Sequence, residues 1–203
     1  MQTSPIARPN AATLKLIRDG TPLLDVRSPG EFHVGKMPNS FNIPILNDDE
    51  RAQVGTTYKQ DGRDAAVKLG HVLVSGALRE QRLAAWREHC QRHPDTHIVC
   101  WRGGLRSGLA QQWLADTGLT QPKVPGGFKT LRNACLYTLD HPEKTWWLLS
   151  GRTGSAKTLI IRTLDNSIDL EGRANHRGSA FGRQLTPQPT PVTFENQLAQ
   201  DYL

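Results

Sequence analysis

The fold is decided by one stretch, Val99-Cys100-Trp101-Arg102-Gly103-Gly104-Leu105-Arg106-Ser107. It begins at the end of an apolar run that predicts a β-strand, and the cysteine follows that strand directly. The two glycines allow a tight backbone arc whose N–H groups can converge on one point. Apolar residues with helical spacing come next, so we expect a helix with Ser107 as its cap and an apolar face that includes Leu109, Trp113 and Leu114.

The chemistry of this stretch follows from its cysteine. The thiolate is the reactive form of cysteine, and cationic neighbours and free backbone N–H groups stabilise it. Two arginines supply the charge, and Arg106 is placed to bind an oxyanion with both arms of its guanidinium. We therefore predict that Cys100 is the catalytic residue and that the anion-binding residues are Arg102, Gly103, Gly104 and Arg106. A buried structural cysteine beside a basic turn is the alternative.

This strand, cysteine, loop, arginine and helix resemble the active-site loop of rhodanese domains, which carry sulfur as a cysteine persulfide. The form Cys-Trp-Arg-Gly-Gly-Leu-Arg-Ser is closer to one family, the tRNA 2-selenouridine synthases. Five residues separate Cys100 from Arg106, one more than in many sulfur-transferring rhodaneses. The longer spacing also resembles the loop of cysteine-dependent phosphatases, so a phosphatase stays a rival interpretation.

A second stretch, residues 24–32, resembles the N-terminal signature of rhodanese domains, together with Gly35, Pro38 and residues 42–44. Lys36 stands where that signature commonly has a histidine. Asp25 and Arg27 are interpreted as a structural polar pair at a strand end. The two stretches together imply one rhodanese-like domain over residues 1–140, an α/β fold with a parallel sheet flanked by helices.

The elements expected in this domain alternate between helices and strands, as in an α/β sheet. The patterns predict helices at 13–19, 31–33, 65–69, 78–90 and 129–139, and strands near 23–26, 41–43, before Cys100 and at Val124. Residues 55–63 are expected to be a loop, since they combine glycines with basic and aromatic groups. Such a mixture can hold an RNA backbone and stack bases, although it is more often plain surface.

A phosphate-binding motif follows the first domain. The apolar residues 146–150 predict a strand, and residues 151–158, Gly-Arg-Thr-Gly-Ser-Ala-Lys-Thr, lead into the helical residues 159–164. This is the Walker A context, in which backbone N–H groups and a lysine hold phosphates and a threonine hydroxyl can bind magnesium. The predicted phosphate-binding residues are Gly151, Gly154, Lys157 and Thr158. Ala156 replaces the usual glycine, which weakens nucleotide hydrolysis as a function and leaves diphosphate binding.

Residues 145–203 are expected to form the N-terminal part of a P-loop NTPase-like α/β domain. A second strand is predicted at 168–172, and residues 175–182 resemble a His-Arg-Gly-Ser and Phe-Gly signature of the selenouridine synthases. A helix is expected at 194–200. The sequence holds no Walker B-like acidic strand end, so the chain is interpreted as a truncated gene product or a part of a longer protein.

Composition restricts the class of protein. The chain has 37% hydrophobic and 22% charged residues and a net charge of +6, which describe a globular protein and are compatible with nucleic-acid binding. It has no apolar run of membrane-spanning length and no signal peptide, so we expect a cytoplasmic protein with no membrane contact. Cys90, Cys100 and Cys135 are widely spaced, which argues against a disulfide framework and a metal-ligand motif.

The resemblance implies a function. A tRNA 2-selenouridine synthase replaces the sulfur of wobble 2-thiouridine in tRNA with selenium from selenophosphate, and it attaches a geranyl group to that sulfur from geranyl diphosphate. The partners implied are tRNA, selenophosphate and geranyl diphosphate, with magnesium possible and no tightly bound cofactor. The alternatives are a rhodanese-type sulfurtransferase, a cysteine phosphatase and a non-catalytic tRNA-binding remnant.

Overall fold

The computed structural model describes residues 6–152, 154–178 and 180–203. Its centre is a parallel sheet of three strands, β1 (Leu23–Asp25), β2 (Ser40–Asn42) and β3 (His97–Val99), in the order β2-β1-β3. Parallel strands need crossover connections. Helix α2 (Pro29–Val34) joins β1 to β2, and α3 (Asp48–Leu73) and α4 (Gly76–Arg92) join β2 to β3. The predicted α/β fold with a parallel sheet flanked by helices is therefore confirmed.

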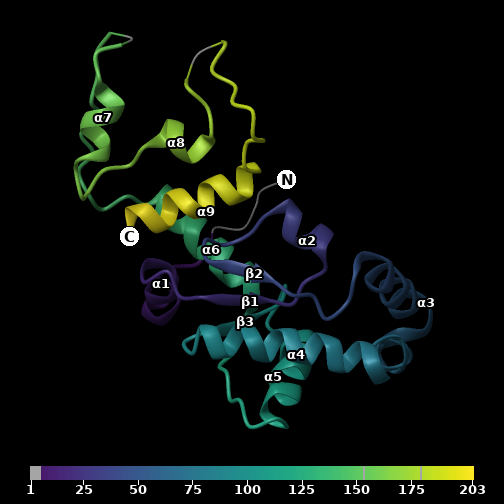
Figure 1. Cartoon of the computed structure of the whole chain (residues 1–203). Coiled ribbons are helices and arrows are strands. Elements are labelled where there is room, and N and C mark those ends of the chain that lie inside the picture. Colours follow the sequence, from purple (N-terminus) through teal and green to yellow (C-terminus); the bar gives the residue numbers. More distant parts are fainter. Residues whose placement is uncertain (1–5, 153, 179) are drawn as a thin grey trace.

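Helices cover both faces of the sheet (Figure 1). Leu24 and Ile98 are paired across β1 and β3 and pack on one face with Trp86 of α4. The next pair along these strands is Asp25 and Val99, and Val99 packs on the opposite face of the sheet with Leu131. A sheet that is apolar on both faces is buried on both, so helices on each side are required. Helices α4 and α5 (Leu105–Ala115) cover one face, and α1 (Ala11–Arg18) and α6 (Gly127–Asp140) cover the other.

The expected loop at residues 55–63 is wrong, because this segment lies inside α3. Asn47 caps the helix and forms a reciprocal capping box with Glu50, and the acidic residues of the first turn complement the helix dipole. The helix is interrupted only at Gly62, whose φ of 86° is readily adopted by glycine. Gly62 thus marks a kink between two helical arms rather than a surface loop.

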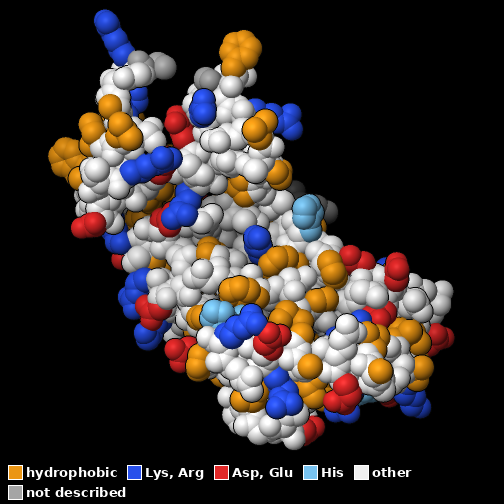
Figure 2. Space-filling view, in the orientation of Figure 1, with side chains coloured by type: hydrophobic (Ala, Val, Ile, Leu, Met, Phe, Trp, Pro, Cys, Tyr) orange, Lys and Arg blue, Asp and Glu red, His pale blue; other side chains and the backbone are white. Residues whose placement is uncertain are grey.

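The predicted strands at 146–150 and 168–172 are also wrong. Residues 146–150 are not a strand, and Trp147 and Leu148 are 92% and 91% exposed. A strand needs a neighbour for its backbone groups, and none of the described segments pairs with this one. Residues 170–174 form the short helix α8 (Leu170–Ala174), capped by the side chain of Asp169. Figure 2 shows hydrophobic side chains protruding in this upper part of the molecule.

The predicted helix at 194–200 is confirmed as α9 (Pro191–Tyr202), and it packs on the face of α1 and α6. Figure 1 shows α9 against the sheet domain, while α7 (Lys157–Arg162) and α8 lie beyond it. The buried Ala199 of α9 belongs to the same apolar cluster as Ile17 and Leu131. The last helix of the chain therefore completes a layer that begins with the first helix.

The described part of the chain holds no helix that is long and apolar enough to cross a membrane.

Candidate active site

Cys100 lies directly after β3, at the carboxyl edge of the sheet, where parallel α/β sheets bind ligands. Its side chain is 3% exposed, and its Sγ donates to Ser107 Oγ at 3.2 Å. Ser107 Oγ in turn donates to the carbonyl of Gly104 at 3.1 Å. The expected cap is therefore wrong, because Gly104 occupies the N-cap of α5 and Ser107 lies in the first turn. Ser107 instead holds the thiol against the loop.

Two glycines let the Cys100 loop pack against the loop before α6. Gly103 and Gly127 have φ of 63° and 64°. A Cβ on Gly103 would lie 2.7 Å from the Val124 carbonyl oxygen, and one on Gly127 would collide with the backbone of Cys100 and Gly103. The two loops are also tied by a hydrogen bond of 2.8 Å from Phe128 N to the Cys100 carbonyl. Gly103 thus serves a close backbone approach in addition to its predicted place in an anion loop, whereas a Cβ on Gly104 would meet only open space.

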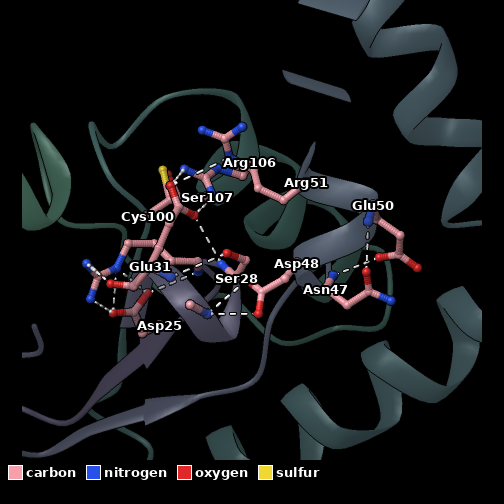
Figure 3. A network of polar contacts seen from close by, with 12 residues as sticks. Asp25, Ser28, Glu31, Asn47, Asp48, Glu50, Arg51, Cys100, Arg106 and Ser107 are labelled. Carbon is pink, nitrogen blue, oxygen red and sulfur yellow. Dashed lines mark hydrogen bonds and ion pairs between the residues drawn. The ribbon is translucent and has the colours of Figure 1, made fainter. Parts of the chain in front are cut away.

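Arg106 lies beside the thiol and is held by a carboxylate (Figure 3). Its Nη1 and Nη2 donate to the two oxygens of Glu31, the second at 3.1 Å, and both side chains are about one-fifth exposed. Burial alone would raise the pKa of Glu31, but the hydrogen bonds and charge of Arg106 hold it below its usual range. The Arg106 guanidinium was predicted to bind an oxyanion. In the structure the same two nitrogen atoms bind the Glu31 carboxylate.

Glu31 is the site residue that the sequence analysis missed. It is the third helical residue of α2, and it closes a capping box with Ser28, whose N–H donates to Glu31 Oε2 at 3.1 Å. Arg51 of α3 adds a cation 3.6 Å from the same carboxylate. The pattern Ser-x-x-Glu is a readable capping signal, but the pairing with an arginine 75 residues away is not visible in it.

The predicted structural pair Asp25 and Arg27 is confirmed as a fully buried ion pair. Arg27 Nη2 lies 2.6 Å from Asp25 Oδ2, and both side chains are 0% exposed. The guanidinium also donates to the carbonyls of Glu31 and Gly35 and stacks 3.8 Å from the Phe128 ring centre. This pair thereby joins the end of β1 to α2 and to the start of α6, the elements that flank the Cys100 loop.

Arg102 is exposed, unlike Arg106. The neighbouring Trp101 stacks on Phe128 with ring centres 5.6 Å apart. The Arg102 side chain faces solvent. The structure thus brings Cys100, Ser107, Arg106 and Glu31 together and leaves Arg102 at the rim.

The described residues of the phosphate loop are 151–152 and 154–158, which lead into α7, and Thr153 lies outside the described residues. Lys157 Nζ donates to the carbonyls of Gly151 and Arg152, both at 2.8 Å. Ala156 has a φ of 60° in the left-handed region, the conformation for which the generic motif uses glycine. Gly154 has a φ of 82°, and Thr158 is half-buried in the first turn of α7. The Lys157 side chain therefore folds back onto two backbone carbonyl oxygens at the start of the loop.

Comparison with known proteins finds similarity to the same family that the sequence motifs resemble. A tRNA 2-selenouridine synthase from Pseudomonas aeruginosa (strain LESB58) is 52% identical over 192 residues, which are 93% of this chain and 52% of that protein. One from Serratia proteamaculans (strain 568) is 53% identical over 179 residues, 88% of this chain and 48% of that protein. Residues 144–203 match the family described as the tRNA 2-selenouridine synthase AAA domain. The chain spans about half the length of the curated relatives it matches.

A solved structure supports the α/β fold. The N-terminal domain of a "putative ATP/GTP binding protein" from Clostridium difficile 630 is 32% identical, with a TM-score of 0.51, and the match covers 55% of this chain and 85% of that domain. The chain belongs to the same family as that domain. Its similarity to the selenouridine synthases extends over nearly its whole length.

The other two cysteines differ from Cys100 in their surroundings. Burial raises the pKa of the Cys90 thiol to about 11. Burial also raises the pKa of the Cys135 thiol to about 12, although the charge of Arg132 opposes this. Both side chains lie in apolar clusters. A thiol held in its neutral form is a poor nucleophile, so neither Cys90 nor Cys135 is a candidate nucleophile.

Within residues 6–152, 154–178 and 180–203, no group of three or more His, Cys, Asp or Glu side chains is arranged to hold a metal ion.

Proposed function

We propose that this chain is part of a tRNA-modifying transferase that replaces the sulfur of wobble 2-thiouridine with selenium from selenophosphate and also geranylates that sulfur from geranyl diphosphate. The observation that carries the proposal is the thiol of Cys100, held by Ser107 beside the Arg106 guanidinium at the carboxyl edge of the sheet. The similarity to tRNA 2-selenouridine synthases supports the substrate class. The proposal places the protein in the cytoplasm with tRNA as its partner.

The Cys100 loop is the proposed site of the selenium step. Cys100 handles the selenium or sulfur, while Arg106, Arg102 and the N–H groups of Gly103 and Gly104 bind the oxyanion of selenophosphate. A guanidinium binds a carboxylate and a phosphate through the same two-armed geometry. Arg106 therefore exchanges Glu31 for the incoming anion, and Glu31 keeps the arginine oriented while the site is empty of substrate.

The loop of residues 151–158 is the proposed diphosphate site, in a P-loop unit over 145–203 that follows a rhodanese-like domain over 1–140. The hydrogen bonds of Lys157 to the carbonyls of Gly151 and Arg152 support this proposal, because they hold its ammonium group at the loop. The N–H groups of Gly151 and Gly154 bind phosphate oxygens, and Thr158 would supply a hydroxyl to magnesium. Lys157→Ala should weaken diphosphate binding measured by titration, and an unchanged affinity would remove this loop from the proposal.

The decisive experiment replaces the nucleophile. Cys100→Ser keeps the size of the side chain but offers an oxygen that stays protonated, so selenium insertion should collapse in a protein of the relatives' length, while tRNA binding survives. Nucleoside mass spectrometry of 2-thiouridine-containing tRNA measures the product. Cys90→Ser and Cys135→Ser are matched controls that should retain activity. Selenium insertion at the normal rate without Cys100 would refute the proposed role.

A cysteine phosphatase is the second candidate, favoured by the five residues between Cys100 and Arg106, and a rhodanese-type sulfurtransferase is the alternative that the resemblance to rhodanese domains offers. Such an enzyme would act on small donors without tRNA. Turnover of thiosulfate or a phosphate ester that is independent of tRNA would support it. A requirement for tRNA, together with tRNA affinity that falls steeply with salt as counterions are released, would support the modifying enzyme instead.

A further inference from the structure

The carboxylate of Glu31 lies between two guanidinium groups beside the Cys100 loop (Figure 3). Arg106 of α5 donates to both of its oxygens, and the distance from Nη2 to Oε1 is 3.1 Å. Arg51 of α3 approaches the same Oε1, with its Nε 3.6 Å away. A separation of 3.6 Å is too long for a hydrogen bond. Arg106 is therefore the hydrogen-bonded partner of the carboxylate, and Arg51 is a neighbouring positive charge.

Contacts between α3 and α2 fix the place of Arg51 relative to Glu31. Asp48, in the first turn of α3, accepts from the Gly30 N–H through both of its oxygens, at 2.9 and 3.1 Å. One turn after Arg51, Gly55 leaves room for the guanidinium, because a Cβ there would lie 2.6 Å from Arg51 Nη1. The starts of the two helices are thus joined, and the half-exposed Arg51 side chain stays near Glu31 when the loop changes its ligand.

The capping box of α2 restricts how the Glu31 carboxylate can move. Its Oε2 accepts from the Ser28 N–H at 3.1 Å. A carboxylate that turned away into solvent would lose this hydrogen bond and the reciprocal cap. A rotation that keeps Oε2 at Ser28 and brings Oε1 to an ordinary charge-assisted distance from Arg51 requires a movement of only about 0.7 Å. The cap therefore favours a change of arginine partner over departure of the carboxylate.

We propose that Arg51 is a positioning residue of the Cys100 loop, which takes over the Glu31 carboxylate when an oxyanion binds to Arg106. The inference rests on the proposed function, in which Arg106 exchanges Glu31 for an incoming anion. In the empty loop the charges of Arg106 and Glu31 neutralise each other. An oxyanion on Arg106 leaves Glu31 as a second negative charge beside it, and pairing with Arg51 offsets that repulsion. Arg51 thereby raises the affinity for the anion without touching it.

The experiment measures binding of inorganic sulfate to the whole chain by calorimetric titration at constant ionic strength. Arg51→Gln should weaken sulfate binding about fivefold, the effect of losing one partly exposed ion pair. Arg87→Gln is the matched control, since Arg87 is an exposed arginine of α4 and its loss changes the net charge by the same amount. At about 0.15 M salt, screening over about 8 Å should keep the effect of the control below about twofold.

A double-mutant cycle tests whether Arg51 acts through Glu31. In a Glu31→Gln background there is no carboxylate for Arg51 to receive, so Arg51→Gln should change the sulfate affinity by less than about twofold. Arg51→Lys keeps the positive charge and should restore most of the affinity that Arg51→Gln loses. Equal losses in the two backgrounds would mean that Arg51 binds the anion directly, and this would overturn the exchange. An Arg51→Gln variant that binds sulfate as the parent chain does would also overturn it.

Arg106→Ala separates this inference from the proposed function on which it rests. If the Cys100 loop is the anion site, Arg106→Ala should lose sulfate binding. Sulfate binding that requires Arg106 but is unchanged in Arg51→Gln would overturn the role of Arg51 alone. Sulfate binding that survives in Arg106→Ala would remove the loop as the anion site, and the proposed selenium step with it. Denaturant unfolding of each variant confirms that the chain is folded in every comparison.

Discussion

The Glu31–Arg106 pair predicts how the active-site loop responds when its carboxylate is removed. Glu31→Gln keeps the shape of the side chain and an oxygen that can still accept from the Ser28 N–H of the α2 capping box. It removes the negative charge that now engages both arms of Arg106. We therefore expect the variant to fold and to present an unneutralised guanidinium beside Cys100.

The size of the effect follows from the contacts. A hydrogen bond to a charged group contributes about 1.5–3 kcal/mol. The Glu31 and Arg106 side chains are 22% and 21% exposed, so solvent screens part of this and the lower end applies. Since about 1.4 kcal/mol is a factor of ten in affinity, Glu31→Gln should bind a sulfate or phosphate probe about tenfold more tightly. The free energy of unfolding of the Glu31→Gln variant should fall by about 1–2 kcal/mol, because one charge-assisted contact is lost.

The assay is calorimetric titration of sulfate, with denaturant unfolding to confirm the fold. Arg106→Ala should abolish the gain when it is combined with Glu31→Gln, because the guanidinium is then absent. Glu88→Gln is the matched control, since Glu88 pairs with Arg92 on α4 and both of these side chains are more than half exposed. If a folded Glu31→Gln variant binds sulfate no more tightly than the parent chain, Arg106 is not the anion ligand and the assignment of the loop is wrong.

Four further outcomes follow from the described contacts. Asp25→Ala should cost about 3–5 kcal/mol in denaturant unfolding, because it leaves a buried guanidinium without its partner. Gly127→Ala should destabilise by more than Gly118→Ala, since both glycines have positive φ but only the Cβ at Gly127 would collide with the Cys100 loop; equal losses in thermal unfolding would contradict this. The pKa of Glu31 is lowered, so its carboxylate stabilises the fold above its usual pKa of 4.5, and this contribution is lost as pH falls through the folded-state pKa. In Glu31→Gln the plot of unfolding free energy against pH should therefore be flatter on its acid side. The raised pKa of Cys135, about 12, predicts that iodoacetamide labels this residue near neutral pH only after unfolding, which peptide mass spectrometry checks.

Local signals were sufficient for some of this structure and not for the rest. The strands around the Cys100 loop were predictable because their apolar runs are short and end at polar or glycine residues. The kink at Gly62 was misread as a loop, because glycine marks both, and the capping box at Asn47 that starts the helix lies eight residues before the segment. Residues 146–150 have the composition of a strand, but a strand exists only where another strand satisfies its backbone. The pairing of Glu31 with Arg106 depends on the whole fold and has no local signal.

The placement of α9 links the segment that matches the AAA domain to the base of the Cys100 loop. Asn196 is fully buried, accepts from Arg132 and donates to the Lys36 carbonyl at 3.0 Å. A Cβ on the adjacent Gly35 would collide with Val192 of α9.

The carbonyl of that same Gly35 accepts from Arg27 at 2.9 Å, and Arg27 stacks on Phe128, whose N–H binds the Cys100 carbonyl. These contacts form a continuous path of packed and hydrogen-bonded groups, so a shift of α9 would press on Gly35 and on Arg27, which its carbonyl holds. If residues 145–203 bind a diphosphate as proposed, α9 is the element through which that binding would bear on the thiol, because it is the part of the segment that packs into the core beneath the loop.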